Sequence, residues 1–154
     1  MRKNAIDAFY NSAAEFCKYL NETVITTDET KRLLEKLMLL YLDALHLPDV
    51  EPDSVERGTD IAIQGINLKI ETPCDYWDVF DPYIDHDVIG CSLYDDLTDI
   101  SRDLLKGISE YDAGLINNAA FEWKTLFKAH WGMHAMGAIR ALSSLMMGDN
   151  KITD

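Results

Sequence analysis

The sequence predicts an all-α protein, a single-domain bundle of about five helices. One observation is the spacing of apolar residues, which recur every three or four positions along most of the chain, as in amphipathic helices. A second is the composition: 154 residues with 47% hydrophobic and 10% aromatic side chains suffice for one buried core. We expect this domain over residues 1–148 and a frayed tail over residues 149–154.

The first two helices are predicted from this periodicity and from their end signals. The first covers about residues 3–20 and has one buried face. Thr26 precedes Glu29 by three residues, which matches a capping box, so a second helix should begin there. It should continue to Leu47, because Pro48 cannot extend it. Apolar residues cover more than half of its circumference, so we expect it to be the central helix, enclosed on several sides.

The middle of the chain gives weaker signals. Residues 48–59 read as an acidic loop, and residues 60–70 fit either a hairpin or one face of a short helix. We favour the helix, since a lone hairpin is marginal without a sheet to join. Residues 75–83 read as an ordered acidic and aromatic loop between the second and fourth helices, with its aromatic rings packed on the bundle. The aspartates that follow lack the EF-hand pattern, so we expect Asp85 or Asp87 to cap the next helix.

A fourth helix is predicted over about residues 87–111, with a leucine- and isoleucine-rich buried stripe. It also carries a row of aspartates that could suggest metal binding. On the helical wheel Asp95 and Asp99 lie opposite the stripe, on a solvated face with neighbouring basic residues. Asp96 and Asp103 lie at the margin of the stripe and could turn inward.

The fifth helix, predicted over residues 115–147, carries the most unusual feature of the sequence. A short connector should join it to the fourth helix as an antiparallel hairpin. At 100° per residue, His130 and His134 fall near the middle of its apolar stripe, one turn apart. The wheel therefore predicts a buried histidine pair. Gly132 and Gly137 should allow another helix to approach closely beside these rings.

An unpartnered buried imidazole costs about 1–3 kcal/mol, so something polar should satisfy the two rings. One interpretation is a pair of core histidines bonded to a backbone carbonyl, a tyrosine or a carboxylate. The other is a site, because histidines at i and i+4 can bind one divalent metal ion or place a base beside a pocket. The HExxH motif of zinc proteases is absent, since Trp131 follows His130. We expect no other cofactor.

Several polar residues are candidates to complete such a site. Asp96 and Asp103 are the leading candidates for a carboxylate that approaches His130 or His134. Glu122, Tyr76 and Trp77 are further candidates for a pocket around the histidines. Glu122 lies two turns from His130, about 12 Å along the axis, so it cannot readily share an ion with that histidine.

Charge and cysteine content exclude several classes of protein. The net charge of −13 would repel phosphate backbones and anionic membranes, so we expect no nucleic-acid or membrane partner. No apolar stretch approaches the roughly 20 residues that span a bilayer, and the first residues do not resemble a signal peptide. Three cysteines without CxxC spacing suggest reduced thiols and a cytoplasmic location.

The chain resembles an uncharacterised family of bacterial all-helical proteins, classed as a domain of unknown function. The resemblance is carried by residues 16–20, 39–41 with 47–48, 76–82 (YWDVFDP), 95–100 (DDLTDI) with 103–104, and 121–123 with 130–134 (HWGMH). It implies a helical domain, a helix rather than a hairpin near residues 60–70, and a bacterial cytoplasmic protein. It implies no activity, ligand or catalytic residue.

Two functions follow from the sequence. The strong acidity and the absence of a known catalytic signature favour a non-enzymatic protein-interaction or adaptor domain. The alternative is a small metal-binding or hydrolytic helical-bundle enzyme that uses His130 and His134 with a nearby carboxylate. The substrate, the partner and the oligomeric state do not follow from the sequence.

Overall fold

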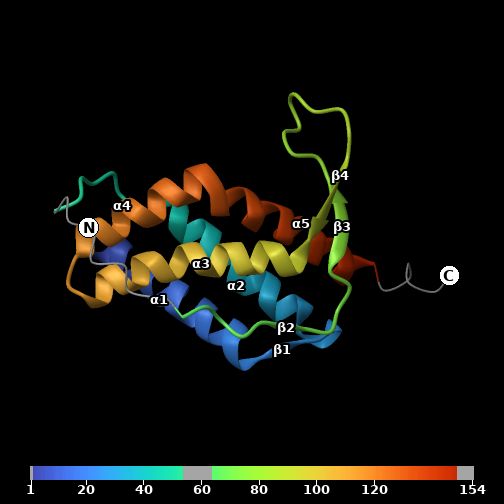
Figure 1. Ribbon diagram of the computed structural model, residues 1–154, viewed down its shortest axis with the longest axis horizontal. Coiled ribbons are helices and arrows are strands. Elements are labelled where there is room, and N and C mark those ends of the chain that lie inside the picture. The colour runs from blue at the N-terminus through green and yellow to red at the C-terminus, as the bar shows by residue number, and fades with distance from the viewer. Residues whose placement is uncertain (1, 54–63, 149–154) are drawn as a thin grey trace.

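The computed structural model describes residues 2–53 and 64–148. The elements, in chain order, are α1 (Arg2–Glu22), β1 (Val24–Ile25), the 3-10 turn η1 (Thr27–Glu29), α2 (Thr30–Leu45), β2 (Lys69–Ile70), β3 (Asp75–Asp78), β4 (Ile89–Ser92), α3 (Leu93–Asp112), α4 (Ile116–Leu126), the π-helical turn η2 (Phe127–Trp131) and α5 (Gly132–Met147). The helices pack along one another as a bundle around a common apolar core (Figure 1). The predicted all-α fold class is confirmed.

The hairpin between α3 and α4 was predicted and forms through a glycine turn. Gly114 has a φ of +84°, a conformation that residues with a Cβ rarely adopt. Its N–H donates to the Tyr111 carbonyl, and the Leu115 N–H donates to the Glu110 carbonyl, each at 2.9 Å. This is a Schellman motif, which satisfies the last carbonyls of α3. None of the described helices is long and apolar enough to cross a membrane.

Helix α2 is not the enclosed central helix that its composition suggested. Its inner face is buried, but Met38, Leu39, Leu42 and Leu45 are all more than half exposed. The capping-box prediction is also wrong, because no side-chain cap is present at Thr26 and the Glu29 carboxylate accepts a hydrogen bond from Tyr19 instead. The helix begins at Thr30 and ends at Leu45, two residues before the predicted end.

The expected helix over residues 60–70 does not form in the described part of that segment. Residues 64–68 form no regular secondary structure, and Lys69–Ile70 pairs in parallel with Val24–Ile25; residues 60–63 lie outside the described part of the chain. Leu68 is buried and Ile66 packs against the core. A non-local strand partner therefore decides the conformation, which local periodicity could not reveal.

The segment before α3 is a β-hairpin rather than a loop and a helical turn. β3 and β4 pair antiparallel, and the hairpin extends from the bundle beside α5 (Figure 1). Neither Asp85 nor Asp87 caps α3, which starts six residues later than predicted: the Ser92 hydroxyl accepts from the Asp95 N–H at 3.4 Å. Most of the aromatic rings of this segment do not pack on the bundle. Trp77, Phe80 and Tyr83 are exposed, and of the four rings only Tyr76 turns inward.

The predicted fifth helix is interrupted by the π-helical turn η2. A π turn holds one more residue than an α turn, so side chains beyond it are rotated from where a straight wheel places them. As a result Trp131 is fully buried, packs 4.8 Å from the Phe127 ring and donates its indole N–H to the Trp123 carbonyl at 3.2 Å. Met133, two residues further along, is 44% exposed.

Candidate metal centre

The two histidines lie where η2 and α5 face helix α3. Their rings are 4.8 Å apart between centroids and nearly perpendicular, at 73°. The prediction that they are buried is wrong: the side chain of His130 is 43% exposed and that of His134 is 30% exposed. The π-turn is the reason, because it rotates Trp131 into the core and moves the histidines to its edge. The rings are therefore reachable from solvent.

Each histidine is held by a buried carboxylate of α3. Nδ1 of His130 lies 2.6 Å from Oδ2 of Asp103, and Nδ1 of His134 lies 2.8 Å from Oδ1 of Asp96. Both aspartates are almost fully buried, at 3% and 5% exposure. A carboxylate accepts hydrogen bonds, so each Nδ1 is the donor, and in a neutral imidazole each Nε2 then has a free lone pair. Asp103 thus contacts His130, and Asp96 contacts His134.

A tyrosine from the hairpin completes the surroundings of Asp96. The hydroxyl of Tyr76 donates to Oδ2 of Asp96, so this carboxylate accepts from a tyrosine and a histidine at once. Burial raises the pKa of Asp96, and the hydrogen bonds from Tyr76 and His134 oppose that rise. Burial and the bond to Asp96 raise the pKa of Tyr76 far above its usual value, so the hydroxyl stays a donor.

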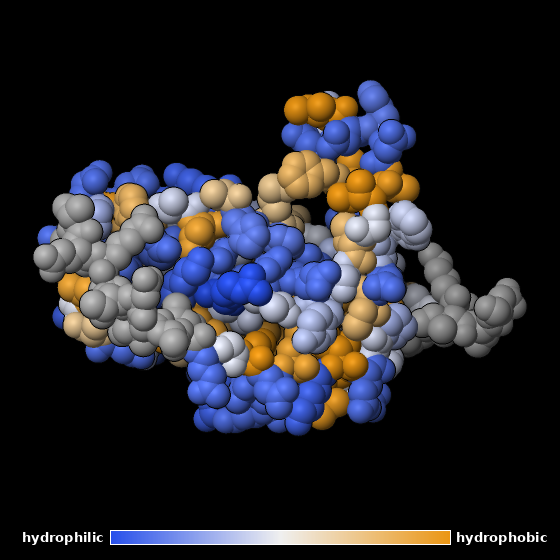
Figure 2. All heavy atoms as spheres, in the orientation of Figure 1, coloured by the Kyte–Doolittle hydropathy of each residue, from blue (hydrophilic) through white to orange (hydrophobic). Residues whose placement is uncertain are grey.

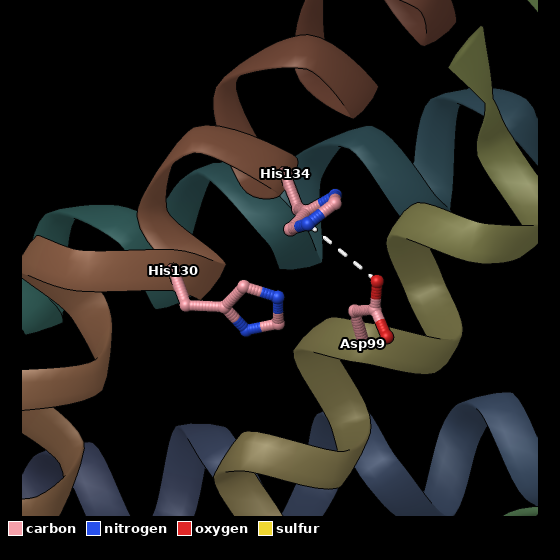
Figure 3. Close-up of side chains that lie close together, drawn as sticks. All are labelled: Asp99, His130 and His134. Atoms are coloured by element: carbon pink, nitrogen blue, oxygen red, sulfur yellow. Dashed lines mark ion pairs between the residues drawn. The ribbon is translucent and has the colours of Figure 1, made fainter.

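A third carboxylate, Asp99, faces the free side of the rings (Figure 3). Its Oδ2 lies 3.5 Å from Nε2 of His134. One ligand atom from each of Asp99, His130 and His134 lies within 4.8 Å of the others. Ligands about 2.1 Å from a tetrahedral ion are about 3.4 Å from each other, so the closest pair already has the required separation. The other two pairs of ligand atoms lie up to 4.8 Å apart, so their side chains would shift by about 1 Å to bind the same ion.

Sequence reasoning missed Asp99 as a ligand and placed it on the solvated face. It is only partly exposed, because α5 packs against this side of α3. The missed signal is the spacing of Asp96, Asp99 and Asp103, which at i, i+3 and i+7 share one helix face. That face is the one opposite His130 and His134.

The other predicted site residues are distributed differently. Glu122 is not in the group formed by the two histidines and Asp99, which is the one group of its kind among the described residues. Trp77 is 73% exposed and lines a hollow of about 420 Å³ between β3 and the end of α5, away from the histidines. Of the hairpin residues predicted for the site, Tyr76 is the one that contacts it, through Asp96.

The atoms nearest to the two glycines do not belong to another helix, contrary to expectation. A Cβ on Gly137 would lie 2.7 Å from the Tyr76 hydroxyl, so this glycine makes room for strand β3. A Cβ on Gly132 would lie 2.4 Å from the carbonyl oxygen of Phe127, so this one makes room for the π-turn itself. Both therefore support the site, one through Tyr76 and the other through the position of His130.

Comparison with known proteins identifies the family but not the activity. A family model described as "Domain of unknown function (DUF5063)" matches residues 2–147. The chain belongs to this family. A crystal structure of protein BF1032 from Bacteroides fragilis is similar in fold, with a TM-score of 0.66 and 23% identity over 92% of this chain and 91% of that one. No curated protein sequence matches the chain.

Proposed function

We propose that this protein binds a divalent transition-metal ion through Asp99, His130 and His134. The observation that carries the proposal is the opposed orientation of the imidazole nitrogens. Each Nδ1 is bonded to a buried carboxylate, while Asp99 faces Nε2 of His134 and lies in one group with both rings (Figure 3). Carboxylate–histidine pairs of this kind orient metal ligands and raise their basicity.

A purely structural role for the histidines explains less of this arrangement. One buried acceptor per ring would satisfy each Nδ1, as Asp103 and Asp96 do. It would not require a third carboxylate on the opposite side of both rings. Two imidazoles and one carboxylate suit Zn²⁺, Fe²⁺ or Mn²⁺, and three protein ligands leave positions for water or an external ligand. Such a centre could polarise a bound molecule, which keeps hydrolytic chemistry within this proposal.

The test is a titration of the metal-free full-length protein with Zn²⁺ and Co²⁺ by calorimetry. We expect one equivalent to bind, and His130→Gln or His134→Gln to weaken binding by at least about 100-fold. His46→Gln is the matched control, because His46 lies at the end of α2 and bonds the Leu42 carbonyl instead.

Equal affinities for wild type, the two site variants and the His46 control would contradict the proposal. So would a stoichiometry of several weakly bound ions per chain, which is the behaviour of a generally acidic surface. Circular dichroism of each variant shows whether the fold is kept. A variant that binds no metal but keeps its helical signal supports a direct role of the imidazole.

A second candidate, a protein-interaction role, is favoured by the β3–β4 hairpin. The hairpin projects from the bundle and carries apolar side chains at its surface (Figure 2). Tyr83 is 97% exposed and Ile84 is 71% exposed, although backbone and Asp81 hydrogen bonds hold their turn in place. Preorganised exposed aromatic residues are typical of binding hot spots. Aspartates beside them favour a partner with an apolar cleft and a basic rim.

This second candidate is tested by photo-crosslinking from Tyr83 in cells, with the same probe at Tyr94 on α3 as control. Tyr94 is 46% exposed, so it samples solvent without belonging to the hairpin. One partner captured in high yield from Tyr83 alone, with basic residues around its crosslink, supports the role. Identical sets of abundant proteins from both positions would count against it. The free thiols of Cys17, Cys74 and Cys91 support a cytoplasmic location for either function.

A further inference from the structure

We infer that the external ligand of this metal centre is a small oxyanion, a phosphoryl or carboxylate group, held jointly by the metal ion, Arg102 and Lys106. The inference rests on the proposed function and names the class of molecule that the centre would bind. It follows from the positions of these two cations, which the metal ligands themselves do not explain.

The two cations border the centre on helix α3. Nη1 of Arg102 lies 3.1 Å from Oδ1 of Asp99, whose other oxygen faces His134. Nζ of Lys106 lies 3.7 Å from Oδ1 of Asp103, whose other oxygen holds His130. Each cation thus contacts one carboxylate of the centre, one turn further along the helix, on the edge that the solvent reaches.

Both cations are free to contact an incoming molecule. The side chain of Arg102 is 60% exposed and that of Lys106 is 41% exposed, so both charged groups reach solvent although Asp103 itself is buried. The more exposed pair, Arg102 with Asp99, contributes only about 0–1 kcal/mol, so a ligand can displace it at little cost. Nζ of Lys106 lies 3.7 Å from the Asp103 oxygen, too far for a hydrogen bond, so its ammonium can donate to a ligand. Hydrophilic side chains cover much of the surface over α3 (Figure 2), which leaves this edge accessible to a polar ligand.

Charge then favours an anion over a neutral or cationic ligand. Counted by formal charge, the carboxylates of Asp96, Asp99 and Asp103 outnumber the two cations by one. A divalent ion reverses that balance and gives these groups a net positive charge, within a chain whose net charge is −13. Arg102 can form paired hydrogen bonds with two oxygens of a phosphate or carboxylate, which a point charge cannot do.

The experiment uses the full-length protein loaded with one equivalent of Co²⁺, whose visible absorption reports changes among the metal's ligands. Inorganic phosphate and acetate are titrated separately, with chloride at equal ionic strength as the reference. We expect at least one of the two oxyanions to change the spectrum with saturation, while chloride does not. A saturating response to phosphate indicates a phosphoryl ligand, and a saturating response to acetate indicates a carboxylate ligand.

The variants separate a binding role from a structural one. Arg102→Gln and Lys106→Gln should each weaken binding of that oxyanion by about tenfold. Arg102→Gln should also bind Co²⁺ as tightly as wild type or more tightly, because Asp99 is released from its partner. If Arg102 had only a structural role, Arg102→Gln would weaken the binding of both Co²⁺ and the oxyanion. Lys31→Gln, which removes an exposed ion pair with Glu35 on α2, should change neither.

The metal centre and its oxyanion ligand are contradicted by different results. A protein that binds no Co²⁺ at the histidines contradicts the metal centre itself. A protein that binds Co²⁺ normally, but whose spectrum neither oxyanion changes, overturns the present inference and leaves the metal centre standing. Oxyanion binding that is equally tight in wild type, Arg102→Gln and Lys106→Gln overturns it as well.

Discussion

Replacing Tyr76 by Phe removes a single oxygen from the link between the hairpin and the candidate centre. The hydroxyl donates to Asp96, which is 5% exposed and holds His134. A hydrogen bond to a charged group contributes about 1.5–3 kcal/mol, and loss of one oxygen opens almost no cavity. The variant no longer desolvates a hydroxyl, so we expect a loss near the lower limit, about 1.5 kcal/mol of unfolding free energy.

The same substitution should weaken metal binding. Asp96 fixes the orientation of the His134 ring, and Tyr76 fixes Asp96. Loss of such an outer partner reduces metal affinity by about 10–100-fold in other proteins. We therefore expect a loss in that range for Co²⁺, with the stoichiometry unchanged.

The assays are urea unfolding of the metal-free protein and Co²⁺ titration of the folded protein. Tyr83→Phe is the matched control, since Tyr83 lies in the turn of the same hairpin and is 97% exposed. It should change stability by less than about 0.5 kcal/mol and leave metal affinity unaltered. If Tyr76→Phe and Tyr83→Phe gave the same values in both assays, the link from Tyr76 through Asp96 to the site would be refuted.

Two further predictions concern the core. A Cβ at Gly107 would lie 2.2 Å from Nε1 of the fully buried Trp123. Gly107→Ala should therefore lower the free energy of unfolding by about 1–3 kcal/mol through overpacking, which exceeds the roughly 1 kcal/mol that alanine gains in helix propensity. Thermal unfolding measures this, and an unchanged or higher Tm would contradict it. Burial raises the pKa of Cys17 to about 12, so its thiol stays protonated in the fold while the unfolded thiol ionises near pH 8.5. Its contribution to stability is complete below that pH and is lost as the pH rises towards 12, by at most about 1.4 kcal/mol per pH unit. Between about pH 8 and pH 10.5, the free energy of unfolding in urea should therefore fall less for Cys17→Ala than for wild type. An equal fall in both proteins would contradict the role of Cys17 in this pH dependence.

The sequence predicted the helices because their packing faces repeat locally. Leu97, Ile100 and Leu104 are fully buried on α3, as their spacing required. It failed where a distant segment decides the conformation. Strand β2, Lys69–Ile70, is held by β1, some 45 residues earlier in the chain, and the start of α3 is delayed by pairing of β4 with β3. Neither pairing leaves a periodic signal in one short segment.

The candidate site was predicted in its components but not in its geometry. Asp96 and Asp103 were identified because they border the apolar stripe of their helix. The burial of the histidines was wrong, since a straight wheel assumes the same turn throughout and η2 inserts a wider one. The π-turn places Trp131 against Phe127 and against Phe9 of the distant helix α1, a contact that a helical wheel cannot include. Asp99 was missed because its role depends on the position of α5 beside α3, which the pattern of α3 alone does not reveal.

The most direct test of the metal centre is a crystal of the full-length protein grown with one equivalent of Zn²⁺, with diffraction data on both sides of the zinc absorption edge. The account predicts one strong anomalous peak about 2.0–2.2 Å from Nε2 of His130, Nε2 of His134 and a carboxylate oxygen of Asp99. Anomalous peaks confined to exposed acidic residues elsewhere, with these three side chains unliganded, would contradict it.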